Sequence, residues 1–320
     1  MKPKQEFKGL RLRLLYGMFR LLRALGLGPS TDQALARPLA QRKANRAPGF
    51  ATLPLPPDVT MSCQNIAGRS GPIEIKKYLP PRLNPDAPRV YFMHGGGWIH
   101  GDVHTLDHLC ASVCRAAGCL IVSVDYRLAP ETVFPGALED CDDGLDWTLR
   151  DPSLGPLPAS GLVVMGESAG GNLAAALCVL RARKGHSPIR HQILIYPALD
   201  ATMASASMHS IDQPGLEPEN MRRLLDAYRG GTAKDDPLLS PMFAENPAAL
   251  PPALILTADI DPLRDDGARY ARKLADAGVK VRHVNYEGMP HGFFFIPGIA
   301  SAAREGIEEI RRELLSLAPR

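Results

Sequence analysis

The hydrophobic and polar positions follow a helical pattern near the amino terminus. Residues 8–26 carry apolar side chains at three- and four-residue intervals, and this spacing predicts an amphipathic helix. The side chains that define its face are Leu12, Leu15, Phe19 and Leu22. A second set fills the adjoining rows: Leu14, Met18, Leu21 and Leu25. Residues 27–58 are rich in proline and predict a loop with one short helix around 32–44.

From about residue 58 onward, short apolar runs alternate with helical segments. The predicted strands are 59–65, 73–79, 89–93, 119–124, 161–165, 192–196, 253–257 and 280–286. The predicted helices between them are 105–117, 135–149, 169–183, 264–277 and 300–316. This alternation indicates a mainly parallel sheet of eight strands with helices on both faces. The run Leu-Val-Val-Met at 162–165 is too apolar for a half-exposed strand and predicts a central, buried one.

Two stretches do not fit the alternation, namely residues 1–57 and about 200–250. The second holds a helical pattern near 217–229 and lies before the last two predicted strands. Insertions at this point often form a lid over a site at the carboxyl ends of parallel strands. We therefore interpret both stretches as one cap over a core that spans residues 58–320.

Charge is distributed unevenly along the 320 residues. Residues 1–50 carry 11 Lys or Arg against two acids, a local balance of +9, which leaves −6 for the other 270 residues. Such a segment can touch anionic lipid or nucleic acid, but its simpler interpretation is a solvated helix face. We therefore expect no nucleic-acid partner, and we favour packing of helix 8–26 within a cap over its seating on a membrane surface, which would suit long-chain lipid substrates. Arginines interrupt the first apolar stretch, and no apolar run approaches the roughly 20 residues of a membrane span.

Six cysteines occur in the chain, at positions 63, 110, 114, 119, 141 and 178. None forms a Cys-x-x-Cys pair, and no histidine spacing completes a zinc site. Buried thiols suit this pattern better than a disulfide framework in a chain of this size. We expect no metal and a cytoplasmic, reducing setting.

The strongest chemical motif is Gly166-Glu167-Ser168-Ala169-Gly170, which follows a predicted strand and opens a predicted helix. A nucleophile has to project from a sharp strand-to-helix turn, and the flanking glycines leave room for that geometry. The bare pattern Gly-x-Ser-x-Gly occurs by chance in many proteins, where it forms a simple strand-to-helix turn. Here the strand before and the helix after supply the context that the motif requires, so Ser168 is the predicted nucleophile.

A second motif, His94-Gly95-Gly96-Gly97-Trp98, follows the strand predicted at 89–93. Three consecutive glycines let backbone N–H groups approach an oxyanion that bulkier residues would block. Loops of this type form the oxyanion hole of lipases and esterases, which the N–H after the nucleophile completes. In this chain that residue is Ala169.

A serine hydroxyl needs a base, and the base needs an orienting acid. His291 lies just past the last predicted strand, which is where the order serine, acid, histidine places the base. The candidate acids lie between residues 259 and 266, after the seventh strand. Asp265 and Asp266 fall at a predicted helix start, where acids commonly cap the helix. Spacing alone does not separate Asp259 from Asp261.

These motifs occur together in an order that resembles the hormone-sensitive-lipase-like carboxylesterases, the bacterial family IV of α/β-hydrolases. The segments that carry the resemblance are residues 94–98, Asp125-Tyr126-Arg127-Leu128-Ala129-Pro130-Glu131, the Ser168 turn, Asp261-Pro262-Leu263-Arg264-Asp265 and His291-Gly292-Phe293. The similarity covers roughly residues 70–300. It implies an α/β-hydrolase fold with a helical cap over a catalytic domain, and an enzyme without a metal or organic cofactor.

The resemblance also implies roles for individual residues. The aspartate that opens the Asp-Pro-Leu motif is the family's triad acid, which selects Asp261. The family's oxyanion donors correspond to Gly96, Gly97 and Ala169. One departure is visible, because the family carries Asp or Thr before the serine and this chain has Glu167.

The predicted activity is hydrolysis of short- to medium-chain esters, with a small-molecule ester as substrate. Trp98 and the rings of Phe293–Phe295 could wall its pocket, although core packing explains them equally well. An amidase or deacetylase would use the same triad. A ligand receptor that keeps the fold would lack the histidine, so His291 argues against that alternative. The last strand, about 280–286, could pair with a second chain and form a homodimer.

Overall fold

The computed structural model describes residues 7–27, 30–44, 46–185 and 187–319. Its centre is one eight-stranded sheet with the strand order β1-β2-β4-β3-β5-β6-β7-β8. The strands are β1 (Thr60–Gly68), β2 (Gly71–Leu79), β3 (Arg89–Met93), β4 (Ile121–Asp125), β5 (Leu162–Glu167), β6 (Ile189–Ile195), β7 (Ala253–Ile260) and β8 (Val281–Pro290). β2 runs antiparallel to β1 and β4, whereas all pairs from β4 to β8 are parallel. The predicted mainly parallel sheet of eight strands is confirmed.

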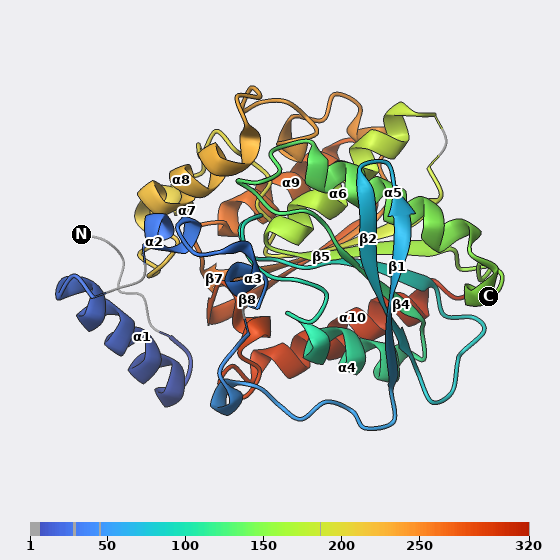
Figure 1. Ribbon diagram of the computed structural model, residues 1–320, viewed down its shortest axis with the longest axis horizontal. Helices are drawn as coiled ribbons and strands as arrows, with labels where there is room; N and C mark the ends of the chain where they lie inside the picture. Colours follow the sequence, from blue (N-terminus) through green and yellow to red (C-terminus); the bar gives the residue numbers. More distant parts are fainter. Residues whose placement is uncertain (1–6, 28–29, 45, 186, 320) are drawn as a thin grey trace.

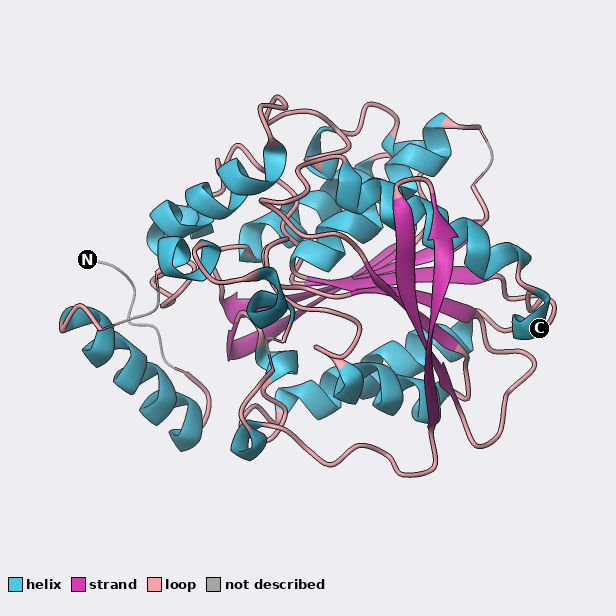
Figure 2. Cartoon of the chain, viewed as in Figure 1, coloured by secondary structure: helices cyan, strands magenta, loops and turns pink. Residues whose placement is uncertain are grey.

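Helices cover both faces of this sheet (Figures 1 and 2). On one face lie α5 (Gly136–Arg150), α6 (Ala169–Arg183) and α9 (Arg264–Asp276). On the other lie α4 (Asp107–Ala117) and α10 (Ala302–Ser316), which pack against each other. Both ends of each of these helices lie within two residues of the predicted ends, and the largest differences are the starts of α4 and α10, each two residues later than predicted. The three-layer arrangement is that of an α/β-hydrolase fold.

The central strand β5 shows why the apolar run at 162–165 fits this position. Leu162 and Val164 pack into the core on the face of α5 and α6, whereas Val163 and Met165 pack into the core on the face of α4 and α10. All four side chains are fully buried. Because successive side chains of a strand point to opposite faces, only a strand covered on both sides accepts apolar residues at every position.

The amino-terminal stretch contains α1 (Leu10–Ala24), as predicted, but two short helices in place of the single one expected at 32–44. These are α2 (Thr31–Leu35) and α3 (Leu39–Lys43). Pro38 separates them, since its ring lacks an N–H and disfavours a helical residue before it. Ser30 and Gln33 form a capping box that starts α2.

The insertion at 200–250 contains α7 (Ala206–Ser210) and α8 (Pro218–Arg229), and it contacts the amino-terminal stretch. Thr31 of α2 donates a hydrogen bond of 3.0 Å to the Asn220 side chain of α8. Arg23 of α1 forms ion pairs with Asp212 and Glu217. Figure 1 shows α1, α2 and α8 on the same side of the molecule. The two stretches outside the strand–helix alternation therefore lie side by side.

Two further features bear on the expectations from sequence. All six cysteines are free thiols, and only Cys63 is exposed. Among the described residues, no helix has both the length and the apolar character needed to cross a bilayer.

Candidate active site

Ser168 lies at the turn between β5 and α6, and its backbone has φ 55° and ψ −117°. This is a positive φ in a residue with a Cβ, the strained conformation expected of a nucleophile turn. The two flanking glycines make room for it. A Cβ on Gly166 would lie 2.1 Å from the Gly170 carbonyl oxygen, and one on Gly170 would lie 2.1 Å from the Met93 carbonyl oxygen. Only glycine fits at either position.

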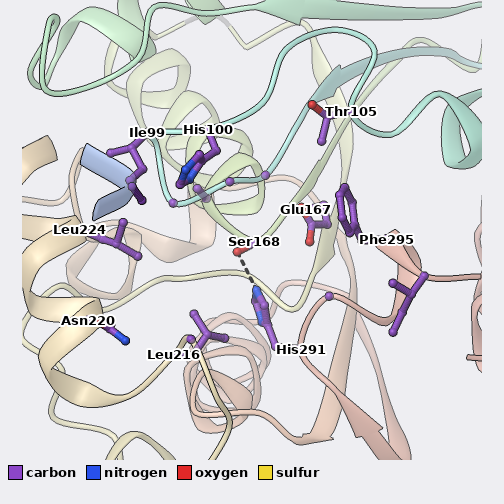
Figure 3. Close-up of a pocket in the computed structure, with 18 of the residues that line it drawn as sticks. Ile99, His100, Thr105, Glu167, Ser168, Leu216, Asn220, Leu224, His291 and Phe295 are labelled. Carbon is purple, nitrogen blue, oxygen red and sulfur yellow. Dashed lines mark hydrogen bonds between the residues drawn. The ribbon is translucent and has the colours of Figure 1, made fainter. Parts of the chain in front are cut away.

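His291 and Asp261 meet because the ends of β7 and β8 pair. Ile260 lies opposite Pro290, so the next residue of each strand emerges at the same edge of the sheet. His291 Nδ1 lies 2.8 Å from Asp261 Oδ2. His291 Nε2 lies 2.8 Å from Ser168 Oγ, and Figure 3 shows this second contact. The predicted serine, histidine and aspartate therefore form one hydrogen-bonded chain.

The structure also separates the acids that spacing left open. Asp261 is fully buried and accepts a hydrogen bond from the backbone N–H of Leu263. Asp259 instead accepts from the N–H of Gly288, at 3.2 Å. Pairing between β7 and β8 is irregular between Ala258 and Ile260, and this interrupts the regular alternation of side chains. Asp265 and Asp266 bind the backbone of residues 207 and 199–200, away from the histidine.

The environment of His291 favours its protonation. Burial lowers the pKa of His291, but the charge of Asp261 and its hydrogen bond outweigh burial, so that the net pKa lies above its ordinary value. Glu167 adds a smaller effect in the same direction. The carboxylates thus stabilise the imidazolium that forms when the ring takes a proton.

Glu167, the residue that departs from the family pattern, is buried beside Ser168 and lines the same pocket. Its carboxylate packs against Gly95, where a Cβ would lie 1.7 Å from Oε2. Burial raises the pKa of Glu167, and the proximity of His291 opposes that rise. The extra methylene relative to aspartate is accommodated by the first glycine of the loop.

The glycine loop approaches Ser168 on the other side of the turn (Figure 3). Gly96 and Gly97 have φ values of 122° and 59°, which favour glycine. A Cβ on Gly96 would lie 2.2 Å from the His100 carbonyl oxygen. Within the described chain, the N–H groups of Gly96 and Gly97 donate to no protein acceptor, which leaves them available to a ligand.

His94 is not a second base. Its ring stacks on Tyr126 with centroids 4.3 Å apart, and Tyr126 donates a hydrogen bond to the His94 carbonyl oxygen. Burial lowers its pKa to about 4, so the ring is neutral near pH 7. This histidine therefore supports the loop backbone.

Two residues of the site carried no signal in the sequence. Gln213, from the insertion, accepts a hydrogen bond from the His291 N–H and donates one to the His291 carbonyl oxygen. Arg42, from α3, is buried and donates to the carbonyl oxygens of Ile99 and Ala129 at 2.7 and 2.8 Å. It also pairs with Glu131. Both fix elements that are distant in sequence, so neither stands in a recognisable motif.

A pocket of about 620 Å³ opens above Ser168. Its lining comes from the glycine loop, the amino-terminal stretch, the insertion and the segment after His291. Most of the lining is apolar, and examples are Leu15, Phe19, Ile99, Leu216, Leu224, Phe295, Ile296 and Ile299. The floor of this pocket is polar and reactive, whereas its walls suit a hydrocarbon chain.

The two predicted pocket residues take different positions. Trp98 contributes to the lining but is 2% exposed, and its ring stacks on Tyr228 with centroids 4.7 Å apart. Phe293 is fully buried between Tyr196 and Tyr286 and does not belong to the lining. The pocket-wall interpretation of Phe293 was therefore wrong, because its ring points into the core. Phe295, which belongs to the same predicted group of rings, lines the pocket.

Among the described residues, one set of side chains has the spacing of metal ligands: Cys63, Glu74 and His104, with ligand atoms within 4.8 Å of one another. The Lys76 ammonium lies 2.8 Å from His104 Nδ1 and places a positive charge at this cluster. None of these residues lines the pocket above Ser168.

Comparison with known proteins agrees with this geometry. Residues 90–295 match the model of a family described by its alpha/beta hydrolase fold. The chain belongs to the α/β-hydrolase family. Esterase LipI of Mycobacterium tuberculosis is 36% identical over 79% of this chain and 80% of its own length. Carboxylic ester hydrolase LipN of the same organism is 34% identical over 93% of this chain and 80% of its own.

Solved structures of related enzymes cover nearly the whole chain. A hyperthermophilic esterase from the archaeon Pyrobaculum calidifontis is 33% identical, with a TM-score of 0.80 over 97% of this chain and 99% of its own. An α/β-hydrolase from the metagenome of Lake Arreo is 30% identical, with a TM-score of 0.87 over 98% and 99%. These relatives place the chain among the hormone-sensitive-lipase-like hydrolases and confirm that prediction.

Proposed function

We propose that the protein is a serine carboxylesterase that hydrolyses short- to medium-chain acyl esters. The observation that carries this proposal is the hydrogen-bonded chain from Ser168 Oγ through His291 to Asp261 at the floor of an apolar pocket. A serine so placed can attack an ester carbonyl, and the relatives named esterases support that substrate class.

The reaction follows from the positions of these groups. His291 Nε2 takes the hydroxyl proton as Ser168 Oγ bonds to the ester carbonyl carbon, and Asp261 holds the ring in the tautomer that can accept it. The N–H groups of Gly96, Gly97 and Ala169 bind the resulting oxyanion. One such donor stabilises the transition state by about 3 to 4 kcal/mol. His291 then protonates the leaving alcohol, and water attacks the acyl-enzyme by the same route.

The cap assignment supports the preference for modest chain lengths. We infer that residues 1–57 and about 200–250 form one cap over the catalytic domain, because both stretches line the pocket and contact each other. Residues 1–6, 28–29 and 45 of the first stretch lie outside the described part of the chain. A wall rich in leucine and isoleucine side chains suits one acyl chain of limited length.

Hydrolysis of p-nitrophenyl esters from acetate to palmitate tests the proposal. Ser168→Ala should abolish activity on every ester, whereas Ser301→Ala, a hydroxyl that caps no helix through its side chain, should leave it unchanged. We expect a maximum at short or medium chains. Activity that survives Ser168→Ala would refute the proposal, and a maximum at palmitate would refute the chain-length preference.

Ester and amide substrates pass through the same oxyanion, so the amidase alternative needs its own comparison. Rates on a matched ester and anilide of one acyl group distinguish the two activities.

The homodimer also remains a proposal: β8 is an edge strand of the sheet and could pair with a second chain. Sedimentation that yields only a 34.6 kDa species would contradict it.

A further inference from the structure

Helix α1 carries two apolar faces, and the described part of the chain buries one of them. Leu12 and Tyr16 are buried against the body of the protein, and Tyr16 stacks on Phe7. The opposite face holds a row that we call the leucine stripe: Leu10, Leu14, Leu21 and Leu25. These side chains are between 60% (Leu21) and 72% (Leu10) exposed. Figure 1 shows the helix along one edge of the molecule.

The stripe is continuous along the helix. At 100° per residue, its four leucines fall within a narrow arc of the helix circumference. Single exposed leucines scattered over a surface are normal in proteins. A contiguous exposed apolar row, in contrast, marks a contact with a membrane or another protein. The remaining question is which partner covers it.

The positive charge of helix α1 indicates which kind of partner covers the leucine stripe. Residues 7–27 contain five Lys or Arg and no acid. Arg20 and Arg23 lie near Asp212, on the protein side. Arg11 and Arg13 flank the stripe, one on each side by helical geometry. In the described chain each donates to a backbone carbonyl oxygen, of Gly298 and Phe7 respectively, and neither pairs with a carboxylate.

We propose that the leucine stripe docks on an anionic phospholipid surface. The four leucines insert into the interface while Arg11 and Arg13 contact lipid phosphates. A two-fold dimer through the same stripe would bring the arginines of two copies together with no acid on the helix to offset them, which disfavours a second copy as the partner. The membrane contact concerns a surface helix and requires no spanning segment.

Docking through the leucine stripe would bring the membrane close to the pocket above Ser168. Met18 lies in the same exposed row, is half exposed and also lines the pocket. Phe50, 72% exposed, lines it as well. A membrane bound at the stripe would therefore lie next to the pocket mouth, where an apolar ester could enter from the lipid phase.

Co-sedimentation of the full chain with vesicles tests the proposal. Vesicles of phosphatidylcholine with about one third phosphatidylglycerol, in about 0.1 M salt, should bind the wild-type protein more tightly than pure phosphatidylcholine vesicles. The variant Leu10→Gln/Leu14→Gln/Leu21→Gln/Leu25→Gln should lose at least about 100-fold in partitioning. Arg11→Gln/Arg13→Gln should lose about 25-fold on anionic vesicles and little on neutral ones.

The matched control is Leu79→Gln/Leu83→Gln, which removes two exposed leucines far from α1 in sequence and should bind like the wild type. The four-glutamine variant should keep the wild-type rate on a soluble short-chain ester without vesicles, which shows that it is folded. Vesicle binding needs no catalysis, so this test is independent of the proposed function.

Three results would overturn the proposal. The first is a wild-type protein that does not bind anionic vesicles. The second is equal binding by the wild type and the four-glutamine variant. The third is a lipid-free dimer that the same four substitutions convert to a monomer, since a second copy would then cover the stripe.

Discussion

The floor and the cover of the pocket are built in different ways. The floor consists of Ser168, Asp261, His291 and the glycine loop, all at the carboxyl ends of parallel strands. The cover consists of the amino-terminal stretch and the insertion. Surface ion pairs such as Arg23 with Asp212 join its two parts, and side chains such as Arg42 fasten it to the floor. Backbone geometry thus fixes the reacting groups, whereas long side-chain contacts fix the walls.

This difference predicts where substitutions act. Changes in the floor should reduce the rate of the chemical step by orders of magnitude, because the reacting groups there must stay at hydrogen-bond distance from one another. Changes in the cover should alter substrate binding or stability by small amounts, because surface ion pairs contribute little individually. The following predictions test that contrast.

The largest effect should separate Asp261 from Asp259. Asp261→Asn keeps the shape of the side chain but no longer holds the histidine in its productive tautomer, so kcat should fall about 10⁴-fold. Asp259→Asn removes a carboxylate two residues away that binds Gly288 instead, and kcat should stay within a few-fold. Steady-state kinetics on p-nitrophenyl butyrate measures both. Equal losses of kcat in the two variants would contradict the assignment of Asp261, and not Asp259, as the acid that orients His291.

Gly96→Ala should have the next largest effect. The added Cβ would collide with the His100 carbonyl oxygen and also force an unfavourable φ, so the oxyanion donors would shift and kcat should fall about 10²- to 10³-fold. Gly278→Ala is the matched control, since its φ is 82° but its Cβ would meet open space. It should cost about 1 kcal/mol of stability and leave kcat unchanged. A normal kcat in Gly96→Ala would contradict the proposal that the N–H groups of this loop bind the oxyanion.

The pH profile reports the charge around His291. The neutral ring is the base, so kcat/KM should fall about tenfold per pH unit below the pKa of His291. The two neighbouring carboxylates raise that pKa, so Glu167→Gln should lower it and move the acidic limb to lower pH. A limb that moves to higher pH would contradict the assigned direction. Glu139→Gln, at a half-buried glutamate outside the pocket, should leave the limb in place.

Gln213 links the cover to the floor and should give an intermediate effect. Gln213→Ala removes both hydrogen bonds to the His291 backbone, so we expect a fall of roughly tenfold in kcat through a less ordered base. The comparison variant Gln33→Ala removes a glutamine of the cover that only caps α2. Its kcat should match the wild type. An unchanged kcat in Gln213→Ala would restrict its role to packing.

The smallest effect should come from the ion pair within the cover. Arg23→Ala breaks half-exposed contacts to Asp212 and Glu217, which should lower the free energy of unfolding by less than about 1 kcal/mol. Thermal denaturation together with KM on a medium-chain ester measures the result. A loss of several kcal/mol would show that the cover depends on this contact.

The same contrast explains what the sequence could predict. The floor was predictable because each reacting group stands at a fixed offset from a strand, as Ser168 does after β5 and His291 after β8. The choice between Asp259 and Asp261 needed either the family resemblance or the observed pairing of Ile260 with Pro290. Spacing could not tell which ring after the strand turns into the core, as Phe293 does, and which lines the pocket, as Phe295 does.

The cover was less predictable. The apolar pattern of residues 8–26 correctly predicted a helix, but it gave no way to tell the buried face from the exposed one. Arg42 and Gln213 reach loops far away in the chain, and such contacts exist only once the fold has formed. Long-range pairing, and not local propensity, decides their roles.

Covalent trapping tests the central claim, that Ser168 forms an acyl-enzyme, most directly. The wild-type protein is treated with a p-nitrophenyl phosphonate, and the modified peptide is located by mass spectrometry. The account predicts one adduct, on Ser168, with stoichiometric loss of activity, and no adduct in Ser168→Ala or in wild-type protein unfolded beforehand. An adduct on another residue that abolishes activity, or full activity after Ser168 is modified, would contradict it.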